Sequence, residues 1–154
     1  MTTTMTLAEL EQASERDLGT SPWHIIDQDR INLFADATDD HQWIHVDPER
    51  AAKGPFGATV AHGYLTMALL PLMLSEIMSL SDSQMGINYG TEKIRFTSPV
   101  PVNSRVRVHA RLRGAERRGS NVVYRVGAEV EIEGKDKPAL VGEFIFLAAG
   151  GRDA

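Results

Sequence analysis

The second half of the chain alternates between apolar and polar residues. The apolar residues Val106, Val108, Ala110 and Leu112 are interleaved with the polar residues Arg105, Arg107, His109 and Arg111. A period of two places successive side chains on opposite faces, so this pattern predicts a strand with one face in water. The alternation returns in residues 122–133, and the glycines within residues 113–120 predict the turn that joins the two strands into a hairpin.

Two more segments extend this hairpin into a sheet. Residues 92–97 and 140–148 have strand-like composition and are set off by the turn-forming sequences Pro-Val-Pro-Val and Gly-Lys-Asp-Lys-Pro. Together the four segments predict an antiparallel meander of four or more strands. Residues 23–26 are a candidate for one short additional strand.

The first half of the chain has helical periodicity. Asp27 or Asp29 can cap a helix, because a carboxylate accepts from the free N–H groups of a first turn. The apolar positions of this helix, Ile31, Phe34, Ala35 and Thr38, follow the spacing i, i+3, i+4, i+7. A second helix is predicted to start at the Asp-Pro-Glu of residues 47–49 and to stop at the Gly-Pro of residues 54–55.

Residues 62–79 form the longest apolar segment. Its apolar residues lie all around a helix, so we expect the rest of the fold to wrap it on every side. Pro71 should kink this helix or occupy a place where the lost hydrogen bond is tolerated. Helices followed by an antiparallel sheet predict an α+β fold.

The length of 154 residues suits a single domain, residues 1–154, with residues 1–14 and 150–154 expected to be flexible. With 16 basic and 21 acidic residues, the net charge of −5 disfavours binding to nucleic acid or to an anionic membrane. The absence of cysteine excludes thiol nucleophiles and is compatible with a reducing cytosol. The start of the chain does not resemble a signal peptide, and residues 63–75 are short for a membrane span. We therefore expect a cytoplasmic protein.

Two short segments carry the candidate chemistry. Asp40 and His45 lie five residues apart in the turn between the two predicted helices, and His62-Gly63 opens the long apolar segment. A carboxylate and an imidazole can move a proton, and the backbone N–H of Gly63 at a helix start can stabilise an oxyanion. The alternative for each is structural: Asp40 as a cap, His45 as a half-buried histidine and Gly63 as a packing contact.

A metal site is a weaker interpretation of the same turn. His41 and His45 have the i, i+4 spacing of the metalloprotease motif His-Glu-x-x-His. Gln42 stands where that motif needs a glutamate as general base, and no third ligand is evident. We therefore expect no metal.

Several motifs together resemble a known family, the MaoC-like or (R)-specific enoyl-CoA hydratases, which have the hot-dog fold. In that fold an antiparallel sheet wraps a long central helix. The resemblance covers most of the chain. It rests on Phe34-Ala-Asp-Ala-Thr-Asp-Asp40, on Ile44-His45 with Ala51 downstream, on Ala61-His62-Gly63, and on Asn88-Tyr-Gly90 through Arg95-Phe96 to Pro99-Val-Pro-Val102.

The resemblance implies specific roles for the candidate residues. Asp40 and His45 would be the hydratase dyad, and the Gly63 amide would bind the thioester oxygen. The reaction would be reversible addition of water to a trans-2-enoyl-CoA, giving an (R)-3-hydroxyacyl-CoA without a cofactor. Substrate-binding residues would include Trp43 and His62, with Met67 on the acyl side and Arg95 as a possible phosphate ligand.

The motif departs from its tightest form at three positions. That form has glycine before the aspartate and Asn-Pro before Ile-His, whereas this chain has Asp39, Gln42 and Trp43 there. Trp43 is large enough to reshape the pocket. The cations Lys93, Arg95, Arg105 and Arg107 are candidates for CoA phosphates, with solvated strand faces as the alternative.

Two other functions are compatible with the same fold. An acyl-CoA thioesterase would need a carboxylate and the helix amide but no Asp-His pair, and an acyl-CoA or acyl-carrier binding module would bind its ligand unaltered. The apolar residues at 140–147 leave a flank for a second copy, so we also expect a homodimer.

Overall fold

The main body of the protein is one antiparallel sheet. The computed structural model describes residues 1–150. The strands run in the order β2, β6, β7, β8, β5, and β3 also pairs with β6. Their bounds are Arg16–Thr20 for β2, His24–Ile26 for β3, Ser83–Arg95 for β5, Ser104–Arg118 for β6, Asn121–Ile132 for β7 and Leu140–Gly150 for β8. All four strands of the predicted meander are present, and the short strand at 23–26 is confirmed as β3. The strand predicted at 92–97 is only the end of β5, which begins at Ser83 and stops at Arg95.

The central hairpin, β6 and β7, follows the predicted alternation. Val106, Val108 and Leu112 are fully buried, while the arginines between them face the other side of the sheet. The predicted turn was too long, because the strands continue to Arg118 and only the Gly119 region turns. Gly119 has a φ of 64°, a left-handed conformation that glycine adopts without a steric penalty.

Six helices accompany the sheet in the described residues. They are α1, Leu7–Gln12; α2, Gln28–Thr38; α3, Trp43–Val46; α4, Pro48–Ala52; α5, Gly63–Ala68; and α6, Leu70–Ser75. Asp27 caps α2 and Asp47 caps α4, as the sequence predicted. The four-residue α3, which carries His45, was not predicted.

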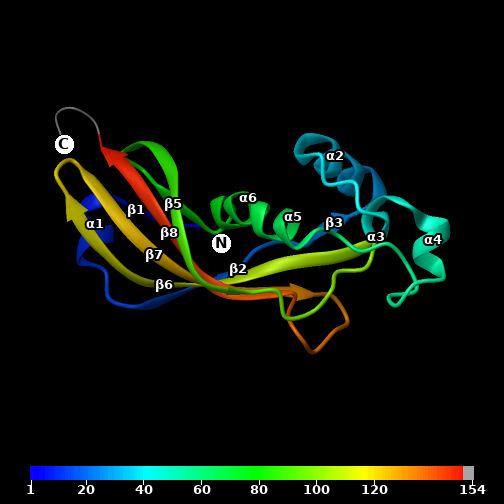
Figure 1. Cartoon of the computed structure of the whole chain (residues 1–154). Coiled ribbons are helices and arrows are strands. Elements are labelled where there is room, and N and C mark those ends of the chain that lie inside the picture. Colours follow the sequence, from blue (N-terminus) through cyan, green and yellow to red (C-terminus); the bar gives the residue numbers. More distant parts are fainter. Residues whose placement is uncertain (151–154) are drawn as a thin grey trace.

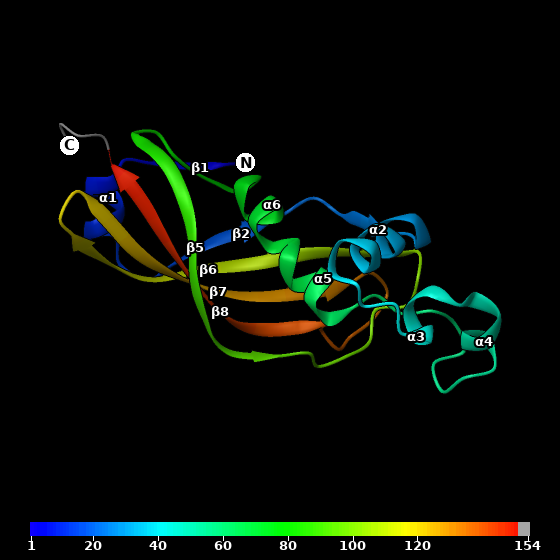
Figure 2. The same cartoon turned by 45° about the horizontal axis from the view of Figure 1, so that its top comes forward.

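The central helix crosses one face of the sheet, as Figures 1 and 2 show for α5 and α6. Its buried residues Leu65, Leu70 and Met73 share one core with the inward side chains of the strands. The prediction of one helix over 62–79 was wrong in two respects. The helix breaks at Leu69, where Pro71 falls in the first turn of α6, and it ends at Ser75 because the chain then enters β4, Met78–Leu80.

One side of this helix is uncovered in the single chain. Tyr64 and Leu72 are exposed, although the sequence predicted burial all round. The neighbouring edge strand β5 is exposed along nearly its whole length. The wrapping by one copy is therefore one-sided, which leaves an apolar surface formed by the helix and β5.

Residues 1–14, for which the sequence predicted a flexible segment, contain a short strand and a helix that packs on the core. Strand β1, Thr3–Met5, pairs in parallel with β4, and α1 buries Leu7 and Leu10 in the core. Thr6 and Glu9 form a reciprocal capping box at the start of α1. At the other end, Gly150 belongs to β8, and the rest of the segment expected to be flexible lies outside the described residues.

This architecture is the hot-dog fold that the sequence resemblance implied: an α+β fold in which an antiparallel sheet curves around a central helix (Figure 1). Within residues 1–150, no helix is long and apolar enough to cross a membrane.

Candidate active site

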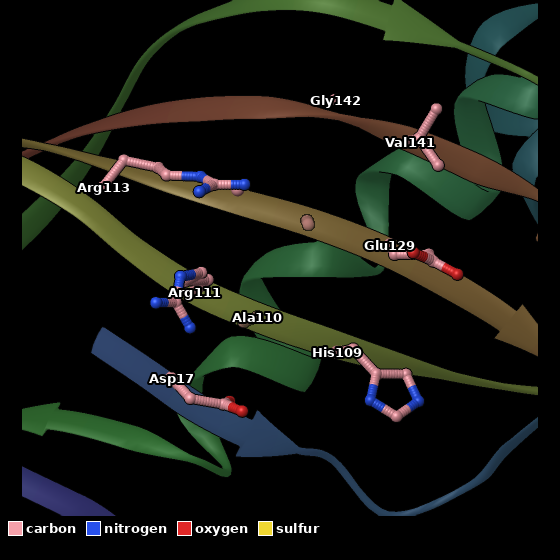
Figure 3. Close-up of a pocket in the computed structure, with 10 residues that line it drawn as sticks. Asp17, His109, Ala110, Arg111, Arg113, Glu129, Val141 and Gly142 are labelled. Atoms are coloured by element: carbon pink, nitrogen blue, oxygen red, sulfur yellow. The ribbon is translucent and has the colours of Figure 1, made fainter. Parts of the chain in front are cut away.

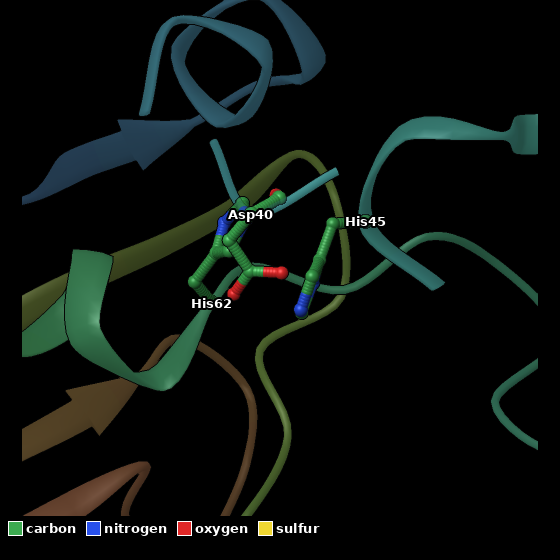
Figure 4. A group of neighbouring side chains, drawn as sticks. All are labelled: Asp40, His45 and His62. Atoms are coloured by element: carbon green, nitrogen blue, oxygen red, sulfur yellow. The ribbon is translucent and has the colours of Figure 1, made fainter. Parts of the chain in front are cut away.

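The structure brings together three of the predicted site residues. Asp40 lies in the turn between α2 and α3, His45 lies in α3, and His62 immediately precedes α5. One carboxylate oxygen of Asp40 and one ring nitrogen of each histidine lie within 4.8 Å of one another. Figure 4 shows the three side chains converging, with the Asp40 carboxylate directed toward the His45 ring. Asp40 and His45, five residues apart in the sequence, thus have their side chains close together in space.

The His45 ring is buried, and one hydrogen bond determines which of its nitrogens carries the proton. The side chain is 8% exposed, and its Nδ1 lies 2.6 Å from the carbonyl oxygen of Val60. A carbonyl can only accept, so Nδ1 carries the proton. In the neutral ring Nε2 is therefore an unprotonated acceptor, which is the form that a general base needs.

The backbone around His45 is held by residues that the sequence analysis missed. Gln28 Nε2 donates to the carbonyl of His45 at 2.8 Å, and the Thr59 hydroxyl donates to Gln28 Oε1 at 2.6 Å. Val60 N–H in turn donates to the carbonyl of Ile44 at 3.0 Å. These bonds tie α2, α3 and the segment before α5 into one unit. A polar residue in the first turn of a helix gives no sequence signal for such a role.

His62 contacts both members of the pair. Its Nε2–H donates to the backbone carbonyl of Asp40 at 3.0 Å. Its ring stacks on that of His45, with centroids 3.8 Å apart and planes inclined by 23°. Phe34 packs against the His62 ring, with the ring centroids 4.9 Å apart. The sequence analysis expected His62 to bind substrate, yet only 3% of it is exposed.

Asp40 itself is exposed, and the conformation of Asp39 sets its direction. Asp39 ends α2 with φ 58° and ψ 21°, in the left-handed region. This is the position at which the tightest form of the family motif has glycine, and the backbone explains why. Aspartate tolerates this region better than most residues with a Cβ atom.

Substitutions at Asp39 should therefore follow backbone conformation. We expect Asp39→Gly to change the free energy of unfolding by less than about 0.5 kcal/mol, whereas Asp39→Val should lower it by about 1–2 kcal/mol. Urea denaturation of the two variants measures both values. Equal stability of the glycine and valine variants would contradict a left-handed backbone conformation at position 39.

Burial lowers the pKa of the His45 imidazole below its ordinary value of 6.5, although the hydrogen bond to Val60 opposes this effect. His62 lowers it further and Asp40 raises it. His45 therefore binds a proton less readily in the folded chain than in the unfolded chain. As the pH falls from about 6.5 to the lower folded value, the unfolded chain is protonated first and stability decreases.

An NMR titration of the histidine rings checks this direction. We expect the His45 ring to titrate with a midpoint below 6.5. His41 serves as an internal control, because its hydrogen bond to Asp36 raises its pKa above 6.5. A His45 midpoint equal to or above that of His41 would contradict the burial argument.

Gly63 is the first residue of α5 and directly follows His62. The N–H groups of a first helical turn have no partner within the helix and carry the positive end of its dipole. The ring of Phe96 covers the Gly63 Cα, since a Cβ atom built there would lie 3.0 Å from the ring. A side chain at position 63 would thus displace Phe96. The Gly63 amide directly follows His62, which contacts both Asp40 and His45.

The remaining predicted residues occupy different places. Trp43 packs beneath the guanidinium of Arg50 and against Gly54, so its ring contacts α4. Met67, one helical turn after Gly63, lines a groove of about 400 Å³ between the helix, β5 and β8. Arg95 is exposed near the end of β5 and donates to the carbonyl of Ile94.

Two of the candidate phosphate ligands are already engaged. Arg107 of β6 pairs with Glu131 of β7 at 2.7 Å, and Arg105 pairs at 3.2 Å with Glu133, which directly follows β7. Both guanidinium groups lie over the ring of Trp23. Their contacts favour the alternative of a solvated strand face.

A second groove lies on the strands β2, β6, β7 and β8, as Figure 3 shows. Its volume is about 350 Å³, and its wall includes Asp17, His109, Arg111 and Arg113. The two arginines both pair with Glu15. None of the predicted site residues lines this groove, which therefore lies apart from the dyad.

The three convergent side chains also raise the possibility of a metal site. Zinc binds imidazole nitrogen at about 2.0–2.1 Å, along the lone pair in the ring plane. The His45 and His62 rings are stacked face to face, so their planes run side by side and do not meet at one point. One nitrogen of each ring is also engaged by a backbone carbonyl. The arrangement suits proton transfer better than metal binding.

Comparison with known proteins adds to this geometry. A family model described as MaoC like domain matches residues 9–133. The 3-hydroxyacyl-thioester dehydratase Z of Mycobacterium tuberculosis is 51% identical over 146 residues, covering 94% of this chain and 97% of that protein. Nodulation protein N of Rhizobium meliloti is 47% identical over 149 residues, covering 94% and 91%. The solved structure of the R-hydratase PhaJ1 from Pseudomonas aeruginosa, unliganded, has a TM-score of 0.70 at 23% identity, covering 90% of this chain and 89% of that one.

Proposed function

This chain belongs to the MaoC-like domain family and is a hydro-lyase, and we propose that it adds water reversibly to trans-2-enoyl-CoA. The product would be an (R)-3-hydroxyacyl-CoA, and no cofactor would take part. The observation that carries the proposal is the convergence of the Asp40 carboxylate and the His45 ring beside the start of α5. The name of the M. tuberculosis relative, a 3-hydroxyacyl-thioester dehydratase, describes the reverse reaction.

The mechanism places one water molecule between Asp40 and His45. The unprotonated Nε2 of His45 and the carboxylate of Asp40 both accept hydrogen bonds, so together they can hold a water and orient its oxygen toward the β-carbon. One of the two takes a proton from this water as the C–O bond forms. That proton is returned to the α-carbon from the same face, which completes a syn addition.

The Gly63 N–H is proposed to bind the thioester oxygen. Addition of water to the conjugated thioester moves electron density onto this oxygen and forms an enolate. A donor fixed at the start of a helix stabilises the enolate more than the ground state, and such a donor typically contributes about 10²–10³ in rate. His62 connects the amide to the dyad, because it directly precedes Gly63 and contacts both Asp40 and His45.

The groove beside Met67 is the proposed site of the acyl chain. It starts one helical turn from Gly63 and is lined mainly by apolar residues of the helix, β5 and β8. The exposed Arg95, near the end of β5, stays a candidate ligand for the phosphates of CoA. The Trp43 ring packs against Arg50 and Gly54, so we propose that it supports the wall of the site without contacting the substrate.

A second copy is proposed to cover β5 and the exposed side of the central helix. An exposed apolar edge strand readily pairs with another chain. Ile87, near the middle of β5, is 41% exposed, and Met85 and Tyr89 on the same strand are exposed as well. The groove beside Met67 opens onto this strand, so a partner there would close it.

Light scattering at micromolar concentration tests the homodimer. We expect the parent chain to have the mass of two copies and Ile87→Lys to have the mass of one, because an inserted charge at the centre of β5 opposes pairing. Leu33→Lys is the matched control, since Leu33 is an exposed apolar residue on α2 and should leave the dimer unchanged. A monomeric parent protein would contradict the proposal.

Incubation with crotonyl-CoA tests the reaction and separates it from its rivals. Loss of the enoyl absorbance without free thiol is the result expected for hydration. Release of free thiol would identify the acyl-CoA thioesterase alternative instead. Neither change, with crotonyl-CoA and with longer enoyl chains, would favour a non-catalytic acyl-CoA or acyl-carrier binding module.

The configuration of the product is tested separately. An (S)-specific 3-hydroxyacyl-CoA dehydrogenase supplied with NAD should not oxidise the product. Efficient formation of NADH would rule out the (R) assignment while leaving hydration itself intact.

A further inference from the structure

We infer that His62 is a positioning residue for the Asp40–His45 pair and does not bind substrate. The inference rests on the proposed function, because it names the residue that holds that catalytic pair in place. His62 contacts Asp40 through a hydrogen bond, His45 through ring stacking and Gly63 through the chain itself. It thus contacts all three proposed catalytic groups.

The two ring edges of His62 differ sharply in their surroundings. Nε2 bonds the backbone carbonyl of Asp40, whereas Nδ1 is buried without a hydrogen-bond partner in the described residues. The Thr66 hydroxyl, four residues along α5, is also buried and unpartnered, so it does not supply the missing donor. A substrate group cannot reach an atom that has no accessible surface, which argues against a binding role.

The unpartnered Nδ1 shows what this position requires. Buried polar atoms without a partner are rare, because leaving one destabilises the fold. A phenylalanine would fill nearly the same volume without that cost and would stack equally well between Phe34 and His45. The feature of histidine that phenylalanine lacks and this site uses is the Nε2–H donor to Asp40. Holding the Asp40 backbone is therefore the function that accounts for a histidine here.

The hydrogen bonds also assign the tautomers of both rings. The Asp40 carbonyl can only accept, so His62 carries its proton on Nε2, and the Val60 carbonyl places the proton of His45 on Nδ1. The two rings stack with their centroids 3.8 Å apart. The stack holds the His45 ring in the orientation that presents its free Nε2, and the Asp40 bond fixes the turn that carries the carboxylate.

Steady-state kinetics of two variants test the positioning role. His62→Phe keeps the ring and the stack but removes the donor, and we expect kcat for crotonyl-CoA to fall about 10- to 100-fold while KM changes less than about threefold. His62→Gln restores an N–H donor at similar reach, and we expect it to recover part of the lost kcat. A rise in KM at unchanged kcat would assign His62 to substrate binding, and unchanged kinetics would reduce it to packing. Either result overturns the inference.

A second measurement is independent of activity and of the variants' folding. Nitrogen chemical shifts of the imidazole rings at neutral pH report which nitrogen carries the proton. We expect the Nε2–H tautomer for His62 and the Nδ1–H tautomer for His45 in the parent protein. A His62 ring protonated on Nδ1 alone could not donate to Asp40, and the positioning role would be abandoned. If crotonyl-CoA is not hydrated but the tautomers are as expected, the proposed function fails while the assigned geometry stands.

Discussion

Asp40→Asn and His45→Gln are each expected to lower kcat/KM for crotonyl-CoA by about 10²–10⁴ while the chain folds normally. A positioned acid–base group contributes a factor of this size, and each substitution removes the proton-transfer function while keeping a similar shape. Asp40 is exposed, so its replacement leaves no buried partner unsatisfied. Enoyl absorbance measures the rate, and circular dichroism with thermal melting measures the fold.

Asp39→Asn is the matched control for this experiment. It removes a neighbouring exposed carboxylate and keeps a residue type that tolerates the left-handed conformation at φ 58°. We expect its kcat/KM to stay within about twofold of the parent. In the proposed mechanism Asp40 and His45 act on one water, so the double variant should be little slower than either single variant. Near-parental turnover in Asp40→Asn or His45→Gln would remove the dyad from the mechanism.

Leu10→Ala is expected to lower the free energy of unfolding by about 2–5 kcal/mol, a large part of the stability of a single domain. Leu10 is 0% exposed and packs in the same core cluster as the strands and the central helix. Truncating a fully buried leucine removes its apolar contacts and leaves a cavity. Denaturant unfolding, monitored by tryptophan fluorescence, measures the change.

Leu33→Ala makes the same chemical change at an exposed position of α2. Leu33 is 69% exposed, so we expect its replacement to change stability by less than about 0.5 kcal/mol. If Leu10→Ala were no more destabilising than Leu33→Ala, the N-terminal residues would not be part of the core.

Strand β6 could be predicted from sequence because burial along it alternates residue by residue. Val106, Val108 and Leu112 are buried on one face of β6, and this leaves a period-two signal that needs no knowledge of the partners. The N-terminal helix left a weaker signal, because only Leu7 and Leu10 of α1 are buried. The Thr6-x-x-Glu9 capping box was present in the sequence and could have identified its start.

The break and the open side of the central helix were harder to predict. Leu69, where the helix breaks, has helical backbone angles, so the break depends on how Pro71 fits after it. Uniform apolarity predicted burial on every side of the helix, and the single chain covers only part of it. Tyr64 and Leu72 belong to the apolar segment that was expected to be buried, yet both are exposed in the single chain.

In the candidate site, too, some features could be predicted from sequence and others could not. The motif residues Asp40, His45 and Gly63 could be identified from their order in the chain. In the structure Asp40 and His45 lie beside His62, the residue that precedes Gly63. The contacts of Gln28 and the stacking of His62 on His45 join segments far apart in sequence. No local pattern specifies such contacts, because they depend on how the segment before α5 folds back onto α3.

The stereochemistry of hydration in D₂O tests most directly whether Asp40 and His45 deliver one water to one face of the substrate. Crotonyl-CoA is converted in D₂O, and the product is analysed by proton NMR for the relative configuration at C2 and C3. We predict a single diastereomer in which deuterium at C2 and oxygen at C3 have added to the same face. Anti addition, or a mixture of configurations at C2, would contradict a single shared water.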